Sequence, residues 1–180
     1  LFFLTPNGER RCQANAVVLA VGGGSWARLG SDGRWCAFLA EAGVALAPLR
    51  PANCGFDVGW SQHLRERFAG QPVKPVVLSF LDRTGARHQR LGEFVLTATG
   101  VEGSGIYALS ALLRDEIEAR GSATLHLDLL PGYDQERVIR ELARPRGARS
   151  LASHLQSRLR LKGVKLGLLH ECLSAETMVD

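Results

Sequence analysis

The chain has 180 residues, of which 46% are hydrophobic, and it carries a formal net charge of +4 at pH 7. This length suits one ordinary domain or two small ones, and the composition is typical of a protein with a packed core, which argues against disorder. No apolar run reaches the roughly 18 to 20 residues of a membrane span, and the apolar opening lacks the basic flank of a signal peptide. We therefore predict a cytoplasmic protein without membrane contact.

The cysteines and the single methionine bear on the compartment and on the extent of the chain. The cysteines form no Cys-x-x-Cys pair and have no histidine at ligand spacing, so we expect free thiols in a reducing compartment and no bound metal. The only methionine is Met178, and the chain opens on Leu1 inside an apolar segment. We therefore expect a piece of a longer protein, whose function belongs to the whole.

The first residues predict two β-strands, 1–6 and 16–21, with Asn7 and Gly8 forming a turn between them. The second is an unbroken apolar run, which is typical of a strand buried on both faces of a sheet.

A helix is predicted next, near 32–42. Its apolar residues recur at helical spacing, Ser31 or Asp32 can cap its start, and Gly43 can end it.

The pattern from residue 44 to residue 130 is mostly that of strands. A short helix near 61–68 interrupts it, and a β-hairpin is predicted around the turn at 82–85. Pro72 and Pro75 predict that the first strand of this hairpin lies at the edge of its sheet, because proline cannot donate to a neighbouring strand.

The last third of the chain is mainly helical. A long helix is predicted over 104–120, ended by Gly121, and a last strand precedes Pro131. Asp134 can cap the first of three helices in the remainder. The chain therefore reads as an α+β protein.

Three consecutive glycines follow the apolar run 16–21. Gly22, Gly24 and Ala27 match a G-x-G-x-x-A pattern, but the next helix begins only near Asp32. No acidic residue ends a second strand about 20 positions later, so a complete dinucleotide site is not expected here. Two explanations stay open: a backbone that approaches a cofactor closely, and a tight turn without a ligand.

The glycine segment resembles the BaiN-like (YhiN-type) family of FAD-dependent oxidoreductases. That family has an A-T-G-G-like strand end, then S-[YW]-P-x-x-G-[ST]-x-G, a helix and a segment closing in P-L. The matching stretches here are Ala20–Trp26, Gly30–Gly33 and Ala47–Leu49. A second block is similar to the family's L-F-T-H-x-G-[IL]-S-G-P-x-x-L-x-x-S, with Gly100, Val101, Gly103 and Ser110 as its recognisable points.

Departures from the family pattern indicate a divergent subgroup. Val21 replaces the usual threonine and Ala27 the usual proline. Ala98 and Thr99 stand where the family has Thr-His, which removes a histidine that a catalytic role could have been assigned to.

The resemblance implies a division of the chain into three parts. Residues 1–30 would be the trailing edge of an FAD-binding domain, and 31–131 a β-rich, barrel-like insert domain with helices near 32–42 and 104–120. Residues 132–180 would be a small helical subdomain. Gly22, Gly23 and Gly24 are the only positions that the resemblance marks as cofactor-binding.

No catalytic residue can be read from the sequence. The five histidines have no serine, cysteine or carboxylate at a telling spacing, and Asp128 fits an outward-facing position in a strand. Gly100, Gly103 and Gly105 precede the long helix and could face a flavin or an anionic substrate, or could serve a loop that needs a positive φ.

The region 137–165 is rich in arginine and lysine. It could meet the phosphates of NADP or of a nucleic acid, but no aromatic residue follows Tyr133, which argues against base stacking and favours a solvated basic face.

The resemblance implies a flavoprotein oxidoreductase in which NAD(P)H or another reductant reduces FAD and the flavin reduces an unknown small-molecule substrate. The insert would cover the flavin, and the partner of this chain would be the remainder of its own FAD-binding domain. We expect the chain alone to be inactive and free of FAD. The alternatives are a nucleic-acid-binding module or a self-association module that uses the 137–165 region.

Overall fold

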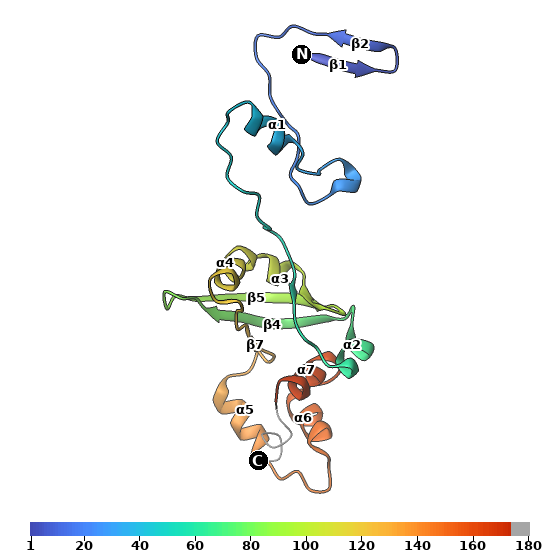
Figure 1. Ribbon diagram of the computed structural model, residues 1–180. Coiled ribbons are helices and arrows are strands. Elements are labelled where there is room, and N and C mark those ends of the chain that lie inside the picture. The colour runs from blue at the N-terminus through green and yellow to red at the C-terminus, as the bar shows by residue number, and fades with distance from the viewer. Residues whose placement is uncertain (174–180) are drawn as a thin grey trace. The chain divides into compact units, whose positions relative to one another are not determined.

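The computed structural model describes residues 1–173 and divides the chain into two compact units, Leu1–Arg50 and a second that begins at Pro51 (Figure 1). Residues 174–180, the end of the predicted helical subdomain, lie outside the described residues. The predicted domain boundaries after residues 30 and 131 stay predictions. Among the described residues, no helix is long and apolar enough to cross a membrane.

The first unit begins with an antiparallel hairpin of β1 (Phe2–Thr5) and β2 (Gly8–Arg11). The prediction that residues 16–21 form its second strand is wrong. Gly8 adopts a left-handed φ of 101°, so the chain reverses at once and the polar residues that follow pair with β1. The run 16–21 pairs with no strand among residues 1–173, and Val18 is 89% exposed. An apolar pattern makes a strand only where a neighbour accepts its hydrogen bonds.

After a single 3-10 turn (η1, Ala27–Leu29), helix α1 spans Trp35–Glu41. The predicted caps are wrong, because the N-cap residue is Arg34 and no side chain caps it. The Asp32 carboxylate instead accepts from the Arg34 amide at 3.1 Å, one step before the helix begins. Gly43 follows the helix with a φ of 79°, so the predicted stop is confirmed.

The second unit is built on a five-stranded sheet in the order β3-β6-β5-β4-β7, in which every neighbouring pair is antiparallel. The strands are β3 (Phe56–Asp57), β4 (Pro72–Leu81), β5 (Arg87–Leu96), β6 (Gly100–Glu102) and β7 (His126–Asp128). With the helices below, this confirms the α+β prediction. Within residues 1–173 the sheet is open rather than a closed barrel, because β3 and β7 each pair on one side only.

The prediction that β4 is an edge strand is wrong, because β4 lies between β5 and β7. β7 is short, however, and pairs only with Val77–Ser79. Pro72 and Pro75 therefore lie in the half of β4 that has no strand on the β7 side, where a missing amide donor costs nothing.

Six helices complete the second unit as described. They are α2 (Gln62–Phe68), α3 (Ser104–Tyr107), α4 (Ser110–Arg120), α5 (Gln135–Leu142), α6 (Leu151–Leu159) and α7 (Val164–Cys172). Ser61, Asp134 and Ser150 cap α2, α5 and α6, each accepting a backbone N–H three residues later. The predicted Asp134 cap is confirmed.

The helix predicted over 104–120 is broken into α3 and α4. The Leu109 amide bonds to the Ile106 carbonyl, three residues back. The single Ser110 hydroxyl proton has two acceptors in reach, the Tyr107 carbonyl at 2.9 Å and the Ala52 carbonyl. This tighter turn places both Ile106 and Leu109 in the core, at 0% and 2% exposure.

The core of the second unit lies around the β4–β5 hairpin. Figure 1 shows α3 beside β5, and α7 with α2 beside β4. The buried members are Leu64, Phe68, Val73, Val76, Leu78, Phe80, Phe94, Leu96, Val101, Ile106, Leu109, Leu113, Val164 and Leu168. A second, smaller cluster of Leu155, Leu159 and Leu161 joins α6 to its neighbours.

Lys165 ties α7 to the sheet. Its ammonium group donates to the Pro75 carbonyl of β4 at 2.6 Å and to the Leu129 carbonyl after β7 at 2.7 Å. Desolvation lowers the pKa of Lys165, and the nearby Asp128 opposes that shift. The Lys165 ammonium group thus acts as a clamp that joins α7 to β4 and to the segment after β7.

Replacing Gly105 by alanine should destabilise the protein. An added Cβ would lie 2.5 Å from Leu78 Cδ1 and 2.6 Å from the Glu93 carbonyl oxygen. We expect the free energy of unfolding to fall by about 1–3 kcal/mol, measured by urea denaturation followed by circular dichroism. Gly132→Ala is the control, because a Cβ there meets nothing within 4 Å. Equal stability of the two variants would contradict this packing.

Replacing Lys165 by methionine removes two charge-assisted hydrogen bonds and keeps most of the aliphatic stem. Since the group is only partly buried, we expect the free energy of unfolding to fall by about 1–2 kcal/mol. The same denaturation measurement serves, with Lys162→Met as the control, because Lys162 is exposed and precedes the same helix. A stability change no larger than that of the control would mean that the clamp contributes nothing.

Candidate functional site

The three glycines predicted to bind cofactor lie in a compact turn of the first unit. The Gly33 amide donates to the Gly23 carbonyl at 3.1 Å, which joins the glycine run to the segment before α1. Trp26 and Ser31 form an antiparallel bridge through two backbone hydrogen bonds of 3.0 and 3.1 Å. The turn therefore folds back on itself and places Ser31 beside the glycines.

The three glycines have different reasons to lack a side chain. Gly22 has a φ of 73°, and a Cβ there would lie 3.1 Å from the Ser31 hydroxyl oxygen. A Cβ on Gly24 would lie 2.9 Å from Leu49 Cδ1. Gly23 has no positive φ, and its Cβ would meet only the Ser31 hydroxyl, at 3.8 Å. Gly23 is thus the one of the three whose missing side chain has no explanation inside the unit.

A pocket of about 550 Å³ opens beside this turn. Its lining includes Gly22, Ser31, Asp32 and Trp35. The Trp35 indole Nε1 is buried and, within residues 1–173, has no hydrogen-bond partner, which leaves a donor free for an acceptor from outside. Sequence reasoning treated Ser31 and Asp32 as helix caps and missed Trp35, although Gly30–Gly33 belongs to the family block.

The second glycine block has internal explanations. A Cβ on Gly100 would collide with the Phe56 carbonyl oxygen, and Gly103 has a φ of 105°. Gly105 packs against β5, as described above. The loop interpretation at Gly103 is therefore supported, and none of the three glycines needs a ligand to account for it.

One histidine has a carboxylate partner that its spacing in the sequence did not indicate. His88 Nε2 lies 2.7 Å from Asp82 Oδ2, and the His88 ring stacks on Phe80 at a centroid distance of 5.0 Å. His154 is 3% exposed, and its Nε2 is 3.4 Å from the Leu142 carbonyl oxygen.

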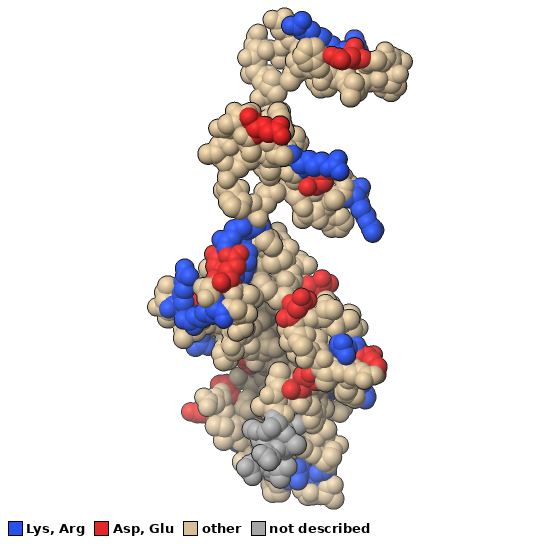
Figure 2. Space-filling model, viewed as in Figure 1, with Lys and Arg blue, Asp and Glu red and all other residues tan. Residues whose placement is uncertain are grey.

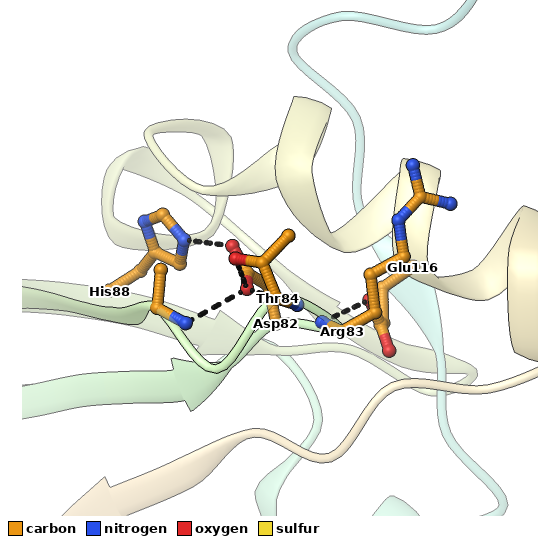
Figure 3. A network of polar contacts seen from close by, with 6 residues as sticks. Asp82, Arg83, Thr84, His88 and Glu116 are labelled. Atoms are coloured by element: carbon orange, nitrogen blue, oxygen red, sulfur yellow. Dashed lines mark hydrogen bonds and ion pairs between the residues drawn. The ribbon is translucent and has the colours of Figure 1, made fainter.

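Asp82 organises the turn between β4 and β5 (Figure 3). Its Oδ1 accepts from the Thr84 amide at 2.8 Å, the Thr84 hydroxyl at 2.6 Å and the Ala86 amide at 3.0 Å. Hydrogen bonds from Thr84 and His88 hold the pKa of Asp82 well below its usual range. Because both carboxylate oxygens are occupied, Asp82 locks the turn and is not poised as a general base.

The same turn is fastened to α4. The Arg83 amide donates to Glu116 Oε2 at 3.0 Å (Figure 3). Arg120 pairs with Glu116 Oε1 at 3.0 Å. Glu116 is 6% exposed, so a buried carboxylate holds the turn through a backbone amide. Sequence reasoning missed this network, because Glu116 and Arg83 are 33 residues apart.

Several cations of the 137–165 region are engaged within the fold. Arg137 lies over the Tyr133 ring at 4.1 Å, Arg144 pairs with Glu141 at 3.2 Å, and Lys165 is the clamp described above. On the face in Figure 2, Lys and Arg alternate with Asp and Glu over the second unit. These contacts engage three of the cations, and the solvated-face interpretation of the region stays a prediction.

Comparison with known proteins gives two findings. The family described as HI0933-like protein barrel and H2TH domain matches residues 50–178. A 3-dehydro-bile acid delta(4,6)-reductase of Clostridium scindens is 28% identical over 137 residues, which are 76% of this chain and 32% of that relative. The chain thus spans about a third of the length of the relative it matches.

The lowered pKa of Asp82 predicts a pH dependence of stability. Its carboxyl binds protons less readily in the folded than in the unfolded chain, whose value is near 3.8. The stabilising contribution is therefore complete above that value and is lost as the pH falls below it. We expect the difference in unfolding free energy between the wild type and Asp82→Asn to shrink below about pH 4, as measured by urea denaturation.

Thr84→Val tests the assigned cause, because it removes the hydroxyl donor that lowers this pKa most. At neutral pH, Thr84→Val should lower the free energy of unfolding less than Asp82→Asn does. On acidification, the free energy of unfolding of Thr84→Val should fall less than that of the wild type. Parallel curves for all three proteins down to about pH 3 would contradict the assignment.

Proposed function

Because this chain belongs to the HI0933-like family, the BaiN-like group that its motifs resemble, we propose that it is part of an FAD-dependent oxidoreductase. In this proposal the chain is a segment of a longer protein. The turn at Gly22–Gly24 contacts the flavin cofactor, and the unit that begins at Pro51 is an insert that covers it. The substrate is a small organic molecule.

The observation that carries the proposal is Gly23. Gly22 and Gly24 are explained by backbone conformation and packing, whereas the space beside Gly23 is empty to 3.8 Å. Gly23 has no internal role, and the adjoining Gly22 lines the pocket to which Trp35, with its buried and unpartnered indole N–H, also belongs. This combination fits a turn that a cofactor approaches closely. The residues present are therefore compatible with a flavin.

When bound, FAD would supply the hydride chemistry, and this chain would supply position and shielding. Gly23 would let the backbone approach the cofactor, and the Trp35 Nε1 and Ser31 hydroxyl would offer donors to its oxygens or nitrogens. The bonded pair Gly23–Gly33 would hold the turn rigid, since both partners are backbone groups of one unit. Rigid placement of donors is what orients a cofactor.

The matched relative is named a 3-dehydro-bile acid delta(4,6)-reductase. This name supports the reduction of an organic double bond as the class of reaction. The match covers 32% of that protein, so we extend only the class of reaction to this chain. NAD(P)H or another hydride donor would reduce the flavin. The substrate, the electron donor and the catalytic side chains belong to the whole protein.

We expect this chain alone to bind no flavin, because its glycine run at 22–24 does not open directly into a helix N-terminus that could receive the pyrophosphate. The test is the visible absorption spectrum of two proteins: this chain and the full reading frame that contains it. A colourless chain and a yellow longer protein are expected. A longer protein from which denaturation releases no flavin would overturn the proposal.

A single variant tests the placement of the cofactor. In the longer protein, Gly23→Val should weaken flavin binding about ten- to a hundredfold, since overpacking costs about 1–3 kcal/mol. Gly59→Val is the matched control, because Gly59, like Gly23, has no positive φ, and a Cβ at Gly59 would meet nothing within 4 Å. Flavin content after dialysis is the measurement. Full flavin occupancy in the Gly23 variant would place the cofactor elsewhere.

The nucleic-acid and self-association alternatives stay open as predictions. No contact of the 137–165 region favours either, because several of its cations are satisfied within the fold.

A further inference from the structure

A second pocket, of about 460 Å³, lies between α2 and α7 in the second unit. The two helices are side by side in Figure 1 and are 96 or more residues apart along the chain. The polar side chains of its lining are Ser61, His63, Arg67, His170 and Glu171. The pocket thus gathers two imidazoles, a guanidinium and a carboxylate from helices that only the fold brings together.

The floor of this pocket is fixed by close packing. A Cβ on Gly167 would lie 2.6 Å from the Phe68 ring, so α7 rests directly on that ring. The Arg67 guanidinium carbon lies over the same ring, 5.7 Å from its centroid. Both helices are also anchored in the core through Leu64 and Leu168, each nearly fully buried. The walls are therefore parts of a packed interface and not of a loop.

The Glu171 carboxylate in the pocket is already hydrogen-bonded within the fold. Glu171 Oε1 accepts from the Ser61 amide at 2.6 Å, and Oε2 accepts from the Ser61 hydroxyl at 2.7 Å. Glu171 thus satisfies the start of α2, where backbone N–H groups lack helical partners. Its negative charge is offset there by donors, which reduces its repulsion of an anion in the rest of the pocket.

The remaining polar groups favour a negative ligand. Among residues 1–173, Arg67 makes no ion pair, and neither His63 nor His170 makes a hydrogen bond through its ring. No group of three histidine, cysteine, aspartate or glutamate side chains in that part of the chain is placed to hold a metal ion. The side-chain N–H groups of Arg67, His63 and His170 are therefore not engaged by the Glu171 carboxylate, which is bonded to Ser61.

We propose that the pocket between α2 and α7 binds a small oxyanion of the phosphoryl class, held by Arg67, His63 and His170. A guanidinium and two imidazoles supply N–H donors that match the oxygens of such a group. All lining residues of this pocket belong to the second unit, and none is part of the glycine turn. The anion site does not rest on the proposed flavin chemistry.

The test uses sulfate as the probe, because its charge is constant over the pH range in which histidine titrates. Sodium sulfate is titrated into the protein at constant ionic strength, and the imidazole ¹H–¹³C signals are followed by NMR. We expect saturable shifts of His63 and His170, with a Kd in about the millimolar range. His126, which does not line this pocket, should stay unmoved. Shifts that are absent, or equal for all three, would overturn the proposal.

Arg67→Gln is the decisive variant, and Arg65→Gln is its matched control. Both lie on α2, but Arg65 lines a different pocket, with Asp57 and Trp60. Losing one charge at contact distance in water should weaken sulfate binding about fivefold or more in Arg67→Gln. Arg65→Gln should bind as the wild type does. Equal weakening in both variants would mean general charge attraction and an adventitious ion only.

A double variant separates the imidazoles from the guanidinium. With His63 and His170 both replaced by glutamine, and Arg67 kept, sulfate binding at one fixed pH should weaken about threefold or more, because the two imidazole donors are lost. Unchanged binding in that variant would overturn the role of the histidines.

Discussion

The second unit depends on the burial of the β4–β5 hairpin. Val73, Val76, Leu78 and Phe80 of β4 are all 2% exposed or less, and no neighbouring sheet strand can cover their faces. The cover comes from helices that are far away in the chain: α3 packs beside β5, and α7 with α2 packs beside β4. The broken helix at Leu109, the clamp of Lys165 and the closeness of α2 to α7 all follow from this requirement. The candidate anion pocket is a by-product of the same packing.

The glycines illustrate how packing and function can be told apart. Gly105 and Gly100 are required because strand backbone or side chains occupy the space of a Cβ, and Gly103 because of its left-handed conformation. Gly23 has neither reason. A glycine that neither conformation nor packing requires is the better candidate for contact with a bound cofactor. The proposed cofactor contact therefore rests on Gly23 rather than on the whole glycine run.

Local signals in the sequence were sufficient for the elements whose causes are local. The Asp134 cap, the stops at Gly43 and Gly121 and the hairpin around Asp82 were all predicted, because each depends on residues within a few positions of one another. The failures were of another kind. Residues 16–21 have the pattern of a buried strand but pair with none of the described strands, and β4 carries prolines yet lies inside its sheet. Both outcomes depend on which segment becomes the neighbour.

By itself the sequence determined the α+β class, most helix and strand positions, and the family, because these follow from periodicity, capping residues and short motifs. Only the tertiary structure decided which glycines have room beside them, that Trp35 keeps a buried donor free, and that His63 and Arg67 meet His170 in one pocket. The reason is physical. Burial, contact and empty space are properties of segments brought together by folding, and no spacing along the chain encodes the distance between α2 and α7.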